Sequence, residues 1–141
     1  MKTDPIIVEQ VVKAKTDEVW KALTDKHQMK IWYFELKDFK PQVGFKFDFL
    51  GGTEDHQYLH LCKVTEAEEN KKLSHTWVYD NYEGNSVVTW ELFETPDGTR
   101  VKLTHVGTET FPKDDPNFAR KSFEAGWNHI VRTSLKDYFE K

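Results

Sequence analysis

The chain has 141 residues, of which 20 are Lys or Arg and 24 are Asp or Glu, so its formal net charge is −4. This length fits one domain, and ten Phe, five Tyr and five Trp side chains can supply a substantial apolar core. The acidic balance, without a cluster of Lys or Arg, excludes the basic surface that nucleic acids and anionic membranes require.

Targeting and covalent features are few. The sequence has no apolar run of about eighteen residues, and its start, from Met1 to Pro5, lacks the apolar stretch of a secretory signal. We therefore expect a soluble, cytoplasmic protein. Because Cys62 is the single cysteine, an internal disulfide and a cysteine-based metal site are excluded.

The first part of the chain predicts one strand and two short helices. Residues 6–12 follow Pro5 and are rich in β-branched side chains, which favours a strand. Thr16 is a suitable N-cap for a helix over residues 17–23, whose acidic first turn favours a helix start. A second short helix over residues 27–32 is expected to place three side chains along one side, namely Gln28, Ile31 and Trp32.

The middle of the chain predicts a series of antiparallel strands. Phe and polar side chains alternate over residues 45–49 before a predicted turn at Gly51 and Gly52, which is typical of a half-buried strand. Further strands are expected at residues 57–64, 73–79, 87–94 and 100–108. The last two should form a hairpin, because Pro96 and Gly98 suit the backbone angles of a tight turn.

The C-terminal residues predict a long amphipathic helix. Asp115 and Pro116 are typical of an N-cap and a first helical residue. Apolar side chains then recur at helical spacing, at Phe123, Trp127, Ile130, Val131, Leu135 and Tyr138. Since the apolar face of the sheet is the available cover for this stripe, we expect an α+β fold in which the helix lies on the sheet.

A period of two places one row of side chains from each strand on a common inner face. These rows are Phe45, Phe47 and Phe49; Leu73, His75, Trp77 and Tyr79; Val88, Trp90 and Leu92; and Val101, Leu103 and His105. If the C-terminal helix stands off this face, Trp127, Ile130 and Val131 form the opposite wall of an apolar pocket; if it packs flush, the same side chains fill a core. Gly126 indicates that the helix either passes close to a strand or leaves room beside the pocket.

The inner rows contain several polar groups. His75 and His105 lie among the apolar residues, while Tyr79 and Trp90 add a hydroxyl and an indole N–H. These groups could orient the polar end of a ligand, or each could be a buried group that its neighbours satisfy.

Metal and nucleophile motifs are lacking. His56 and His60 have a metal-like spacing, but on a strand they lie about 13 Å apart, too far to share one zinc ion. Nothing beside Cys62 indicates an activated thiol, so we expect it to be structural. The sequence therefore predicts neither a metal nor a cofactor.

Four segments, taken in order, resemble a known family. They are TDEVWKALTD at 16–25, followed by Trp32; LSHTW at 73–77; GTRVKLTH at 98–105; and GW at 126–127, leading into LKDYF at 135–139. Together they resemble proteins similar to the C-terminal domain of the Hsp90 ATPase activator, in the START-like or Bet v 1-like helix-grip superfamily. The resemblance implies a curved antiparallel sheet of about six to seven strands around a long C-terminal helix, with two short helices after the first strand. It also implies a hydrophobic cavity between sheet and helix, which in many relatives holds a lipid-like or aromatic molecule.

The residue patterns and the resemblance together imply three functions. The first is non-catalytic binding of a small hydrophobic or aromatic molecule by a cavity lined by Phe47, His75, Trp77, Tyr79, Trp90, Leu103, His105, Trp127 and Val131. The second is an interaction module related to co-chaperones, with an Hsp90-type chaperone as partner, and the third is a cyclase- or hydratase-like enzyme that uses cavity His and Tyr groups. A pocket of about 300 Å³ or more favours binding or catalysis, whereas a solid interior with an exposed apolar patch favours a protein partner.

Overall fold

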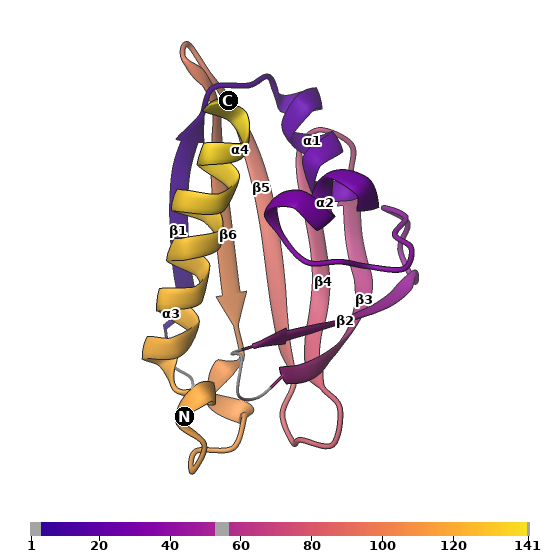
Figure 1. The fold of residues 1–141 in the computed structure, drawn as a ribbon, viewed down its shortest axis with the longest axis vertical. Coiled ribbons are helices and arrows are strands. Elements are labelled where there is room, and N and C mark those ends of the chain that lie inside the picture. The colour runs from indigo at the N-terminus through magenta and orange to yellow at the C-terminus, as the bar shows by residue number, and fades with distance from the viewer. Residues whose placement is uncertain (1–3, 53–56, 141) are drawn as a thin grey trace.

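The computed structural model describes residues 4–52 and 57–140 of the chain. In chain order the elements are β1 (Ile6–Val12), α1 (Thr16–Thr24), α2 (Lys26–Trp32), β2 (Lys46–Gly52), β3 (Gln57–Glu68), β4 (Lys72–Tyr79), β5 (Ser86–Thr95), β6 (Gly98–Val106), α3 (Arg120–His129) and α4 (Lys136–Glu140). A π-helical turn, Ile130–Leu135, joins α3 to α4, so that these three segments form one long C-terminal helix (Figure 1).

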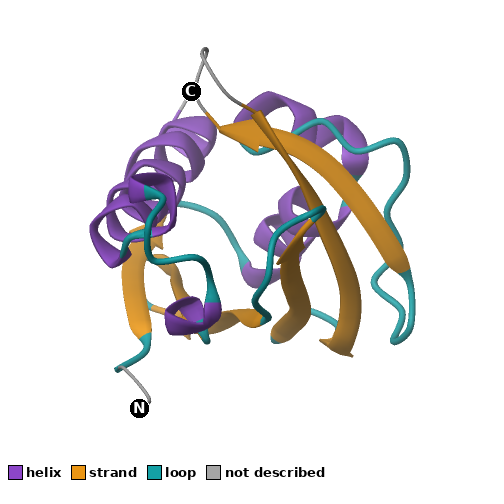
Figure 2. Cartoon of the chain, turned by 90° about the horizontal axis from the view of Figure 1, so that it is seen from below, coloured by secondary structure: helices purple, strands orange, loops and turns teal. Residues whose placement is uncertain are grey.

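The strands form one antiparallel sheet in the order β1-β6-β5-β4-β3-β2. Strands β2 to β6 follow one another as neighbours, whereas β1 pairs with β6 although about a hundred residues separate Ile6 from its partner His105. Figure 2 shows the curvature of this sheet, with the long C-terminal helix beside the β1 end. The predicted α+β fold, with a curved sheet and a long C-terminal helix, is confirmed.

The inner face of the sheet carries the predicted rows. In β4, β5 and β6 every member of these rows is buried, namely Leu73, His75, Trp77, Tyr79, Val88, Trp90, Leu92, Val101, Leu103 and His105. Phe47 and Phe49 are also buried, while Phe45 is half-buried and precedes β2. The period-two assignment of the inner face is therefore confirmed.

The hairpin between β5 and β6 has the predicted turn. Thr95 pairs with Gly98, which leaves Pro96 and Asp97 as the two loop residues. Gly98 has a φ of +150°, and a Cβ added there would lie 2.1 Å from the backbone oxygen of Val12. A side chain at this position is therefore excluded both by backbone angle and by space.

The first helix begins one residue earlier than predicted. Thr16 is its first helical residue and Lys15 is the N-cap. The backbone N–H of Lys15 donates to the carboxylate of Glu18 at 3.0 Å. The Thr16 side chain takes no part in this hydrogen bond. The carboxylate three residues into the helix, and not the hydroxyl, thus determines where the helix starts.

Contrary to the prediction from the sequence, the second helix does not place Ile31 on the same side as Trp32. Ile31 is 70% exposed, whereas Met29 and Trp32 are buried. Trp32 also donates its indole N–H to the carbonyl oxygen of Ala22 in α1 at 2.9 Å, which fixes the rotation of α2. The interior thus contacts the side defined by Met29 and Trp32, and Ile31 lies outside it.

The predicted turn at Gly51 and Gly52 is wrong. Both residues lie within β2 and pair with Tyr58 and Gln57 of β3. A Cβ added at Gly51 would lie 2.8 Å from a ring carbon of Phe34, so glycine is needed there for close packing and not for a turn.

The remaining boundary corrections concern strand ends. Strand β3 continues to Glu68, beyond the predicted end at residue 64, and its register with β4 shifts between Val64 and Glu66. This β-bulge lets the pairing continue through the predicted end. Strand β6 ends at Val106, because Gly107 adopts a φ of +94° and a 3-10 turn begins at Thr108.

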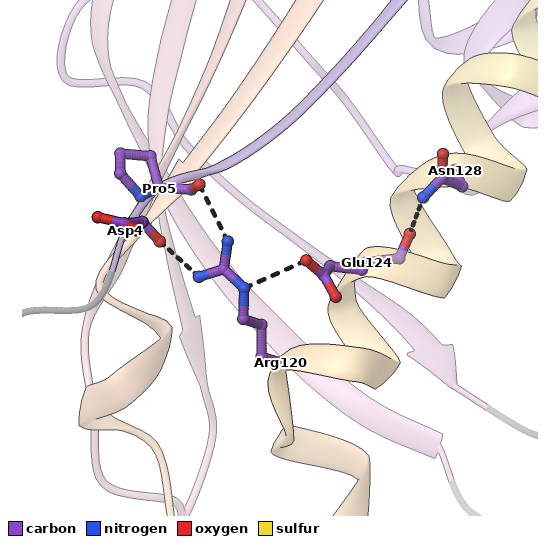
Figure 3. Close-up of polar contacts among 5 residues, drawn as sticks. All are labelled: Asp4, Pro5, Arg120, Glu124 and Asn128. Carbon is purple, nitrogen blue, oxygen red and sulfur yellow. Dashed lines mark hydrogen bonds and ion pairs between the residues drawn. The ribbon is translucent and has the colours of Figure 1, made fainter.

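The C-terminal helix starts after a separate capped turn. Asp115 accepts a hydrogen bond from the backbone N–H of Asn117 at 2.9 Å and caps the 3-10 turn Pro116–Phe118, while α3 begins at Arg120. The Arg120 guanidinium then donates to the carbonyl oxygens of Asp4 and Pro5 and, through Nε, to Glu124 at 3.1 Å (Figure 3). The helix start is thereby tied to the chain just before β1.

No helix within residues 4–52 and 57–140 combines the length and the apolar character needed to cross a membrane.

At its far end, the C-terminal helix is joined to α2 by a hydrogen bond from the hydroxyl of Tyr138 to the side-chain oxygen of Gln28, at 2.9 Å. The helix is thus held at both ends, and its middle segment borders the interior.

Candidate ligand-binding site

A cavity of about 420 Å³ lies between the inner face of the sheet and the C-terminal helix. Most of its wall is aromatic. The lining residues are Trp32, Tyr33, Phe34, Gly51, Tyr58, His60, Trp77, Tyr79, Asn117, Phe118, Ser122, Phe123, Gly126, Trp127, His129, Ile130 and Ser134.

The helical wall of the cavity follows from sequence spacing. Phe123, Gly126, Trp127 and Ile130 recur at intervals of three and four residues, which places them on one face of the helix. Trp127 reaches the sheet, where its ring centroid lies 5.1 Å from that of Trp77 on β4. The helix therefore contacts the sheet at Trp127 and leaves space on the side that faces β2 and β3.

Gly126 contributes to this space. A Cβ built on Gly126 has no heavy atom within 4 Å outside its own chain neighbours and helix backbone, so the helix does not approach a strand at this point. Of the two explanations that the sequence left open, the structure favours the one in which glycine leaves room beside the cavity.

The sheet wall comes from alternate residues of β3 and β4. Tyr58 and His60 on β3 point to the same side as Trp77 and Tyr79 on β4. Their rings pack closely: the His60 centroid lies 4.7 Å from that of Trp77 and 4.7 Å from that of Tyr79. These contacts make the wall an aromatic surface suited to a flat apolar ligand.

His60 is the buried histidine of the cavity lining. Its Nδ1 lies 2.9 Å from the carbonyl oxygen of Tyr58, which assigns the ring proton to Nδ1. The ring stacks on Phe49 with centroids 4.5 Å apart and an interplanar angle of 10°. Burial lowers the pKa of His60 to about 4, so the imidazole is neutral at neutral pH.

His105 is engaged in a network that joins the helix to the sheet. Trp127 donates its indole N–H to Nδ1 of His105 at 3.0 Å, so the neutral ring carries its proton on Nε2 and donates it to Ser86 Oγ at 2.8 Å. Ser86 in turn donates to the carbonyl oxygen of Trp77 at 2.7 Å. The pKa of His105 is lowered to about 3, mainly by burial and to a smaller extent by the charge of His75. Both ring nitrogens of His105 are thus occupied by the protein itself.

His75 lies in the filled part of the interior. Its Nδ1 is 3.0 Å from the carbonyl oxygen of Thr76, and its ring contacts Phe47 with centroids 5.2 Å apart. Burial lowers the pKa of His75 to about 4. It borders a separate void of about 10 Å³, which is large enough for roughly one water molecule.

Two tyrosines in the cavity wall keep their protons. Trp77 donates its indole N–H to the hydroxyl oxygen of Tyr79 at 2.8 Å. Burial raises the pKa of Tyr79 above its ordinary value, although the bond from Trp77 opposes the shift. Burial also raises the pKa of Tyr33 well above its ordinary value. Both phenols are therefore hydrogen-bond donors at neutral pH.

The predicted site residues fall into three groups. Trp77, Tyr79 and Trp127 line the cavity. Phe47, His75 and Trp90 border the small void. Leu103, His105 and Val131 are buried between sheet and helix and line neither space. Residues that the sequence did not single out for the cavity include Tyr33, Phe34, Tyr58, His60 and Phe118.

The described residues contain no group of three or more His, Cys, Asp or Glu side chains placed to hold a metal ion. His56, which was considered with His60 as a metal pair, lies outside the described residues. Burial raises the pKa of the Cys62 thiol well above its ordinary value, so the sulfur stays protonated and is a weak nucleophile.

These features define an α+β protein of the helix-grip class, with an aromatic cavity between the curved sheet and the C-terminal helix. The chain belongs to the family described as Activator of Hsp90 ATPase homolog 1-like protein, whose family model matches residues 13–140. A comparison with curated proteins finds no match.

Several solved structures are similar over most of the chain. A protein from Mesorhizobium loti is 27% identical, with a TM-score of 0.78 and 97% of each chain covered. CalU16 from Micromonospora echinospora is 26% identical, with a TM-score of 0.73, 95% of this chain and 73% of CalU16 covered. A solution structure of a Bacillus halodurans protein is 25% identical, with a TM-score of 0.76 and 98% of each chain covered.

Proposed function

We propose that this protein binds a small hydrophobic or aromatic molecule in the cavity between the sheet and the C-terminal helix. The observation that carries this proposal is the cavity volume of about 420 Å³ together with its aromatic wall. Ligand pockets begin at about 300 Å³, and they combine a mostly apolar lining with a few polar groups. Affinity comes from burial of apolar surface, at about 25 cal/mol per Å², and specificity from the polar groups.

The test is a two-dimensional NMR titration of the full chain with pools of lipids, sterols and plant-type aromatic compounds. We expect saturable shifts of the indole signals of Trp77 and Trp127, because both rings line the cavity. If no pool shifts these signals, the proposal is wrong and the cavity has another role.

A matched pair of variants locates the binding. Gly126→Leu places a side chain into the open space beside the helix and should weaken binding at least about tenfold. Ala125→Leu adds the same side chain at an exposed neighbouring position that does not line the cavity, and it should leave binding unchanged.

A second candidate function is contact with a protein partner, for which an Hsp90-type chaperone is the first choice given the family. The outer face of the sheet favours it, because Leu50 pairs with Leu59 and Leu61 pairs with Val78 to form a continuous apolar patch. Leu50 is 58% exposed. If a purified chaperone of this type binds the chain, Leu50→Asp should abolish the binding, whereas Ile31→Asp, at a still more exposed apolar position on α2, should not.

A further inference from the structure

Tyr33 carries a polar group that the fold leaves unsatisfied. Its hydroxyl oxygen is buried and makes no hydrogen bond within the described residues. Buried hydroxyls without a partner are costly and rare in native proteins, so each one calls for an explanation.

The position of Tyr33 connects this group to the cavity. Tyr33 directly follows α2 and lines both the 420 Å³ cavity and the 10 Å³ void that His75 and Phe47 border. Its ring is held between Phe34, with centroids 4.6 Å apart, and Trp90, at 6.1 Å. The oxygen exposes almost no surface in the free protein, so it reaches a ligand in the cavity only when the side chain turns about its Cα–Cβ bond.

The hydroxyl can act only as an uncharged donor or acceptor. Its burial raises the pKa of Tyr33, and negative charge on Cys62 or Tyr79 would raise it further. The O–H proton is therefore retained at neutral pH, and no group of the described residues accepts it.

The described lining of the cavity offers a ligand no permanently charged side chain. Among the described residues, the lining contains no Lys, Arg, Asp or Glu. His60 is neutral at neutral pH, and Asp115, which accepts from the Tyr58 hydroxyl at 3.0 Å, lies outside the lining. A carboxylate or ammonium group buried in this space would find no permanently charged partner in the described lining and would be disfavoured.

We propose that the Tyr33 hydroxyl selects the ligand by donating a hydrogen bond to it, and that this ligand is an uncharged aromatic molecule with an acceptor oxygen, such as an aryl ketone. This assignment rests on the proposed function, because it gives the ligand of the same cavity a chemical class. It makes Tyr33 the specificity-determining residue and the aromatic walls the source of affinity.

The test compares three probes of similar shape by calorimetric titration of the full chain at pH 7. These are 2-acetylnaphthalene, which has an acceptor oxygen; 2-ethylnaphthalene, which has none; and 2-naphthoate, which is charged. We expect the ketone to bind about five- to tenfold more tightly than the hydrocarbon, as one net hydrogen bond predicts, and the carboxylate to bind most weakly.

Tyr33→Phe should remove the preference for the ketone and leave the affinity for 2-ethylnaphthalene unchanged. The control is Tyr138→Phe, since that hydroxyl donates to Gln28 and does not line the cavity. Because the Tyr33 hydroxyl has no partner in the free protein, Tyr33→Phe should also leave the urea midpoint of unfolding unchanged or raise it.

The outcomes separate the two proposals. Three results would overturn the role of Tyr33 while cavity binding stands. The first is equal binding of ketone and hydrocarbon to the unaltered chain, and the second is a ketone preference that survives in Tyr33→Phe. The third is a lower urea midpoint of unfolding for that variant. If 2-acetylnaphthalene, 2-ethylnaphthalene and all pooled compounds fail to bind at the cavity, both proposals are overturned.

Discussion

The two ends of the interior differ although they share one sheet face. Beneath α1 and α2, bulky side chains such as Leu23, Met29 and Trp90 leave a void of only about 10 Å³. Beside α3, the same kind of aromatic face borders a cavity of about 420 Å³. The inner residues of the sheet are alike, so the difference comes from the element that covers them. Two helices fill one end, whereas a helix that presents Gly126 leaves the other end open.

The largest expected effect tests whether the filled end is a true core. Trp90 is 2% exposed, and its replacement in Trp90→Ala should lower the free energy of unfolding by about 3–5 kcal/mol, measured by urea denaturation. Ile130→Ala removes a half-buried side chain from the cavity wall and should cost only about 1–2 kcal/mol. Equal losses from the two variants would mean that the two ends do not differ in packing.

The pH dependence of stability tests whether the buried histidines at both ends of the interior are shielded from water. Burial lowers the pKa values of His60, His75 and His105 to about 4, 4 and 3, whereas the unfolded chain protonates its histidines near pH 6.5. Between these values the unfolded state binds more protons, so stability is complete above pH 6.5 and falls as the pH drops toward 4. Each histidine contributes up to about 1.4 kcal/mol per pH unit.

Urea midpoints measured between pH 7.5 and pH 4.5 check this expectation. His105→Gln should reduce the slope against pH, because it removes one of the three buried histidines. A midpoint that stays constant over this range would show that the buried histidines protonate in the folded state without cost.

A smaller effect is expected at the glycine of the open end. Since a Cβ at Gly126 meets no atom within 4 Å, Gly126→Ala should raise the free energy of unfolding by up to about 1 kcal/mol through helix propensity. Ala125→Gly, at the exposed neighbouring position, should lower it by a similar amount. A loss of stability in Gly126→Ala, measured by thermal unfolding, would indicate a close approach of helix and sheet.

The smallest effect concerns the attachment of the open end. Arg120 holds the start of α3 to the carbonyl oxygens of Asp4 and Pro5, but its side chain is partly exposed, so Arg120→Met should cost about 0.5–1 kcal/mol. Lys121→Met changes an exposed neighbour and should cost nothing measurable. If the two variants are equally stable in urea, the contacts in Figure 3 do not hold the helix.

The fold could be predicted well from the sequence, because the spacing of apolar residues indicates both the type of each element and the face that it buries. Alternation over residues 73–79 and helical spacing from Phe123 onward placed the inner rows and the covering helix correctly. Errors arose where a single residue was interpreted by its local preference. Gly51 was assigned to a turn although strand pairing and packing against Phe34 require it, and Thr16 was assigned as a cap although Glu18 supplies the bond.

The cavity was harder to predict than the fold. Trp77, Tyr79 and Trp127 lie on the periodic rows, which is why the sequence could identify them. Tyr33 lies just after α2, where no period indicates which way a side chain points. His60 lies on an alternating strand, and extending the inner row to β3 would have identified it. The volume itself depends on how far the helix stands from the sheet, which no residue pattern encodes.

The π-helical turn Ile130–Leu135 sets the phase of the last turns of the helix relative to the segment that borders the cavity. A π turn holds about one residue more than an α turn, and each residue of a helix corresponds to a rotation of about 100°. Loss of one exposed residue here, such as Thr133, would restore a continuous α-helix and rotate Tyr138 away from Gln28. The segment upstream, which borders the cavity, would keep its phase. A deletion at this turn would therefore keep Phe123 to Ile130 in the cavity wall, whereas Ser134 and the last turns of the helix would rotate.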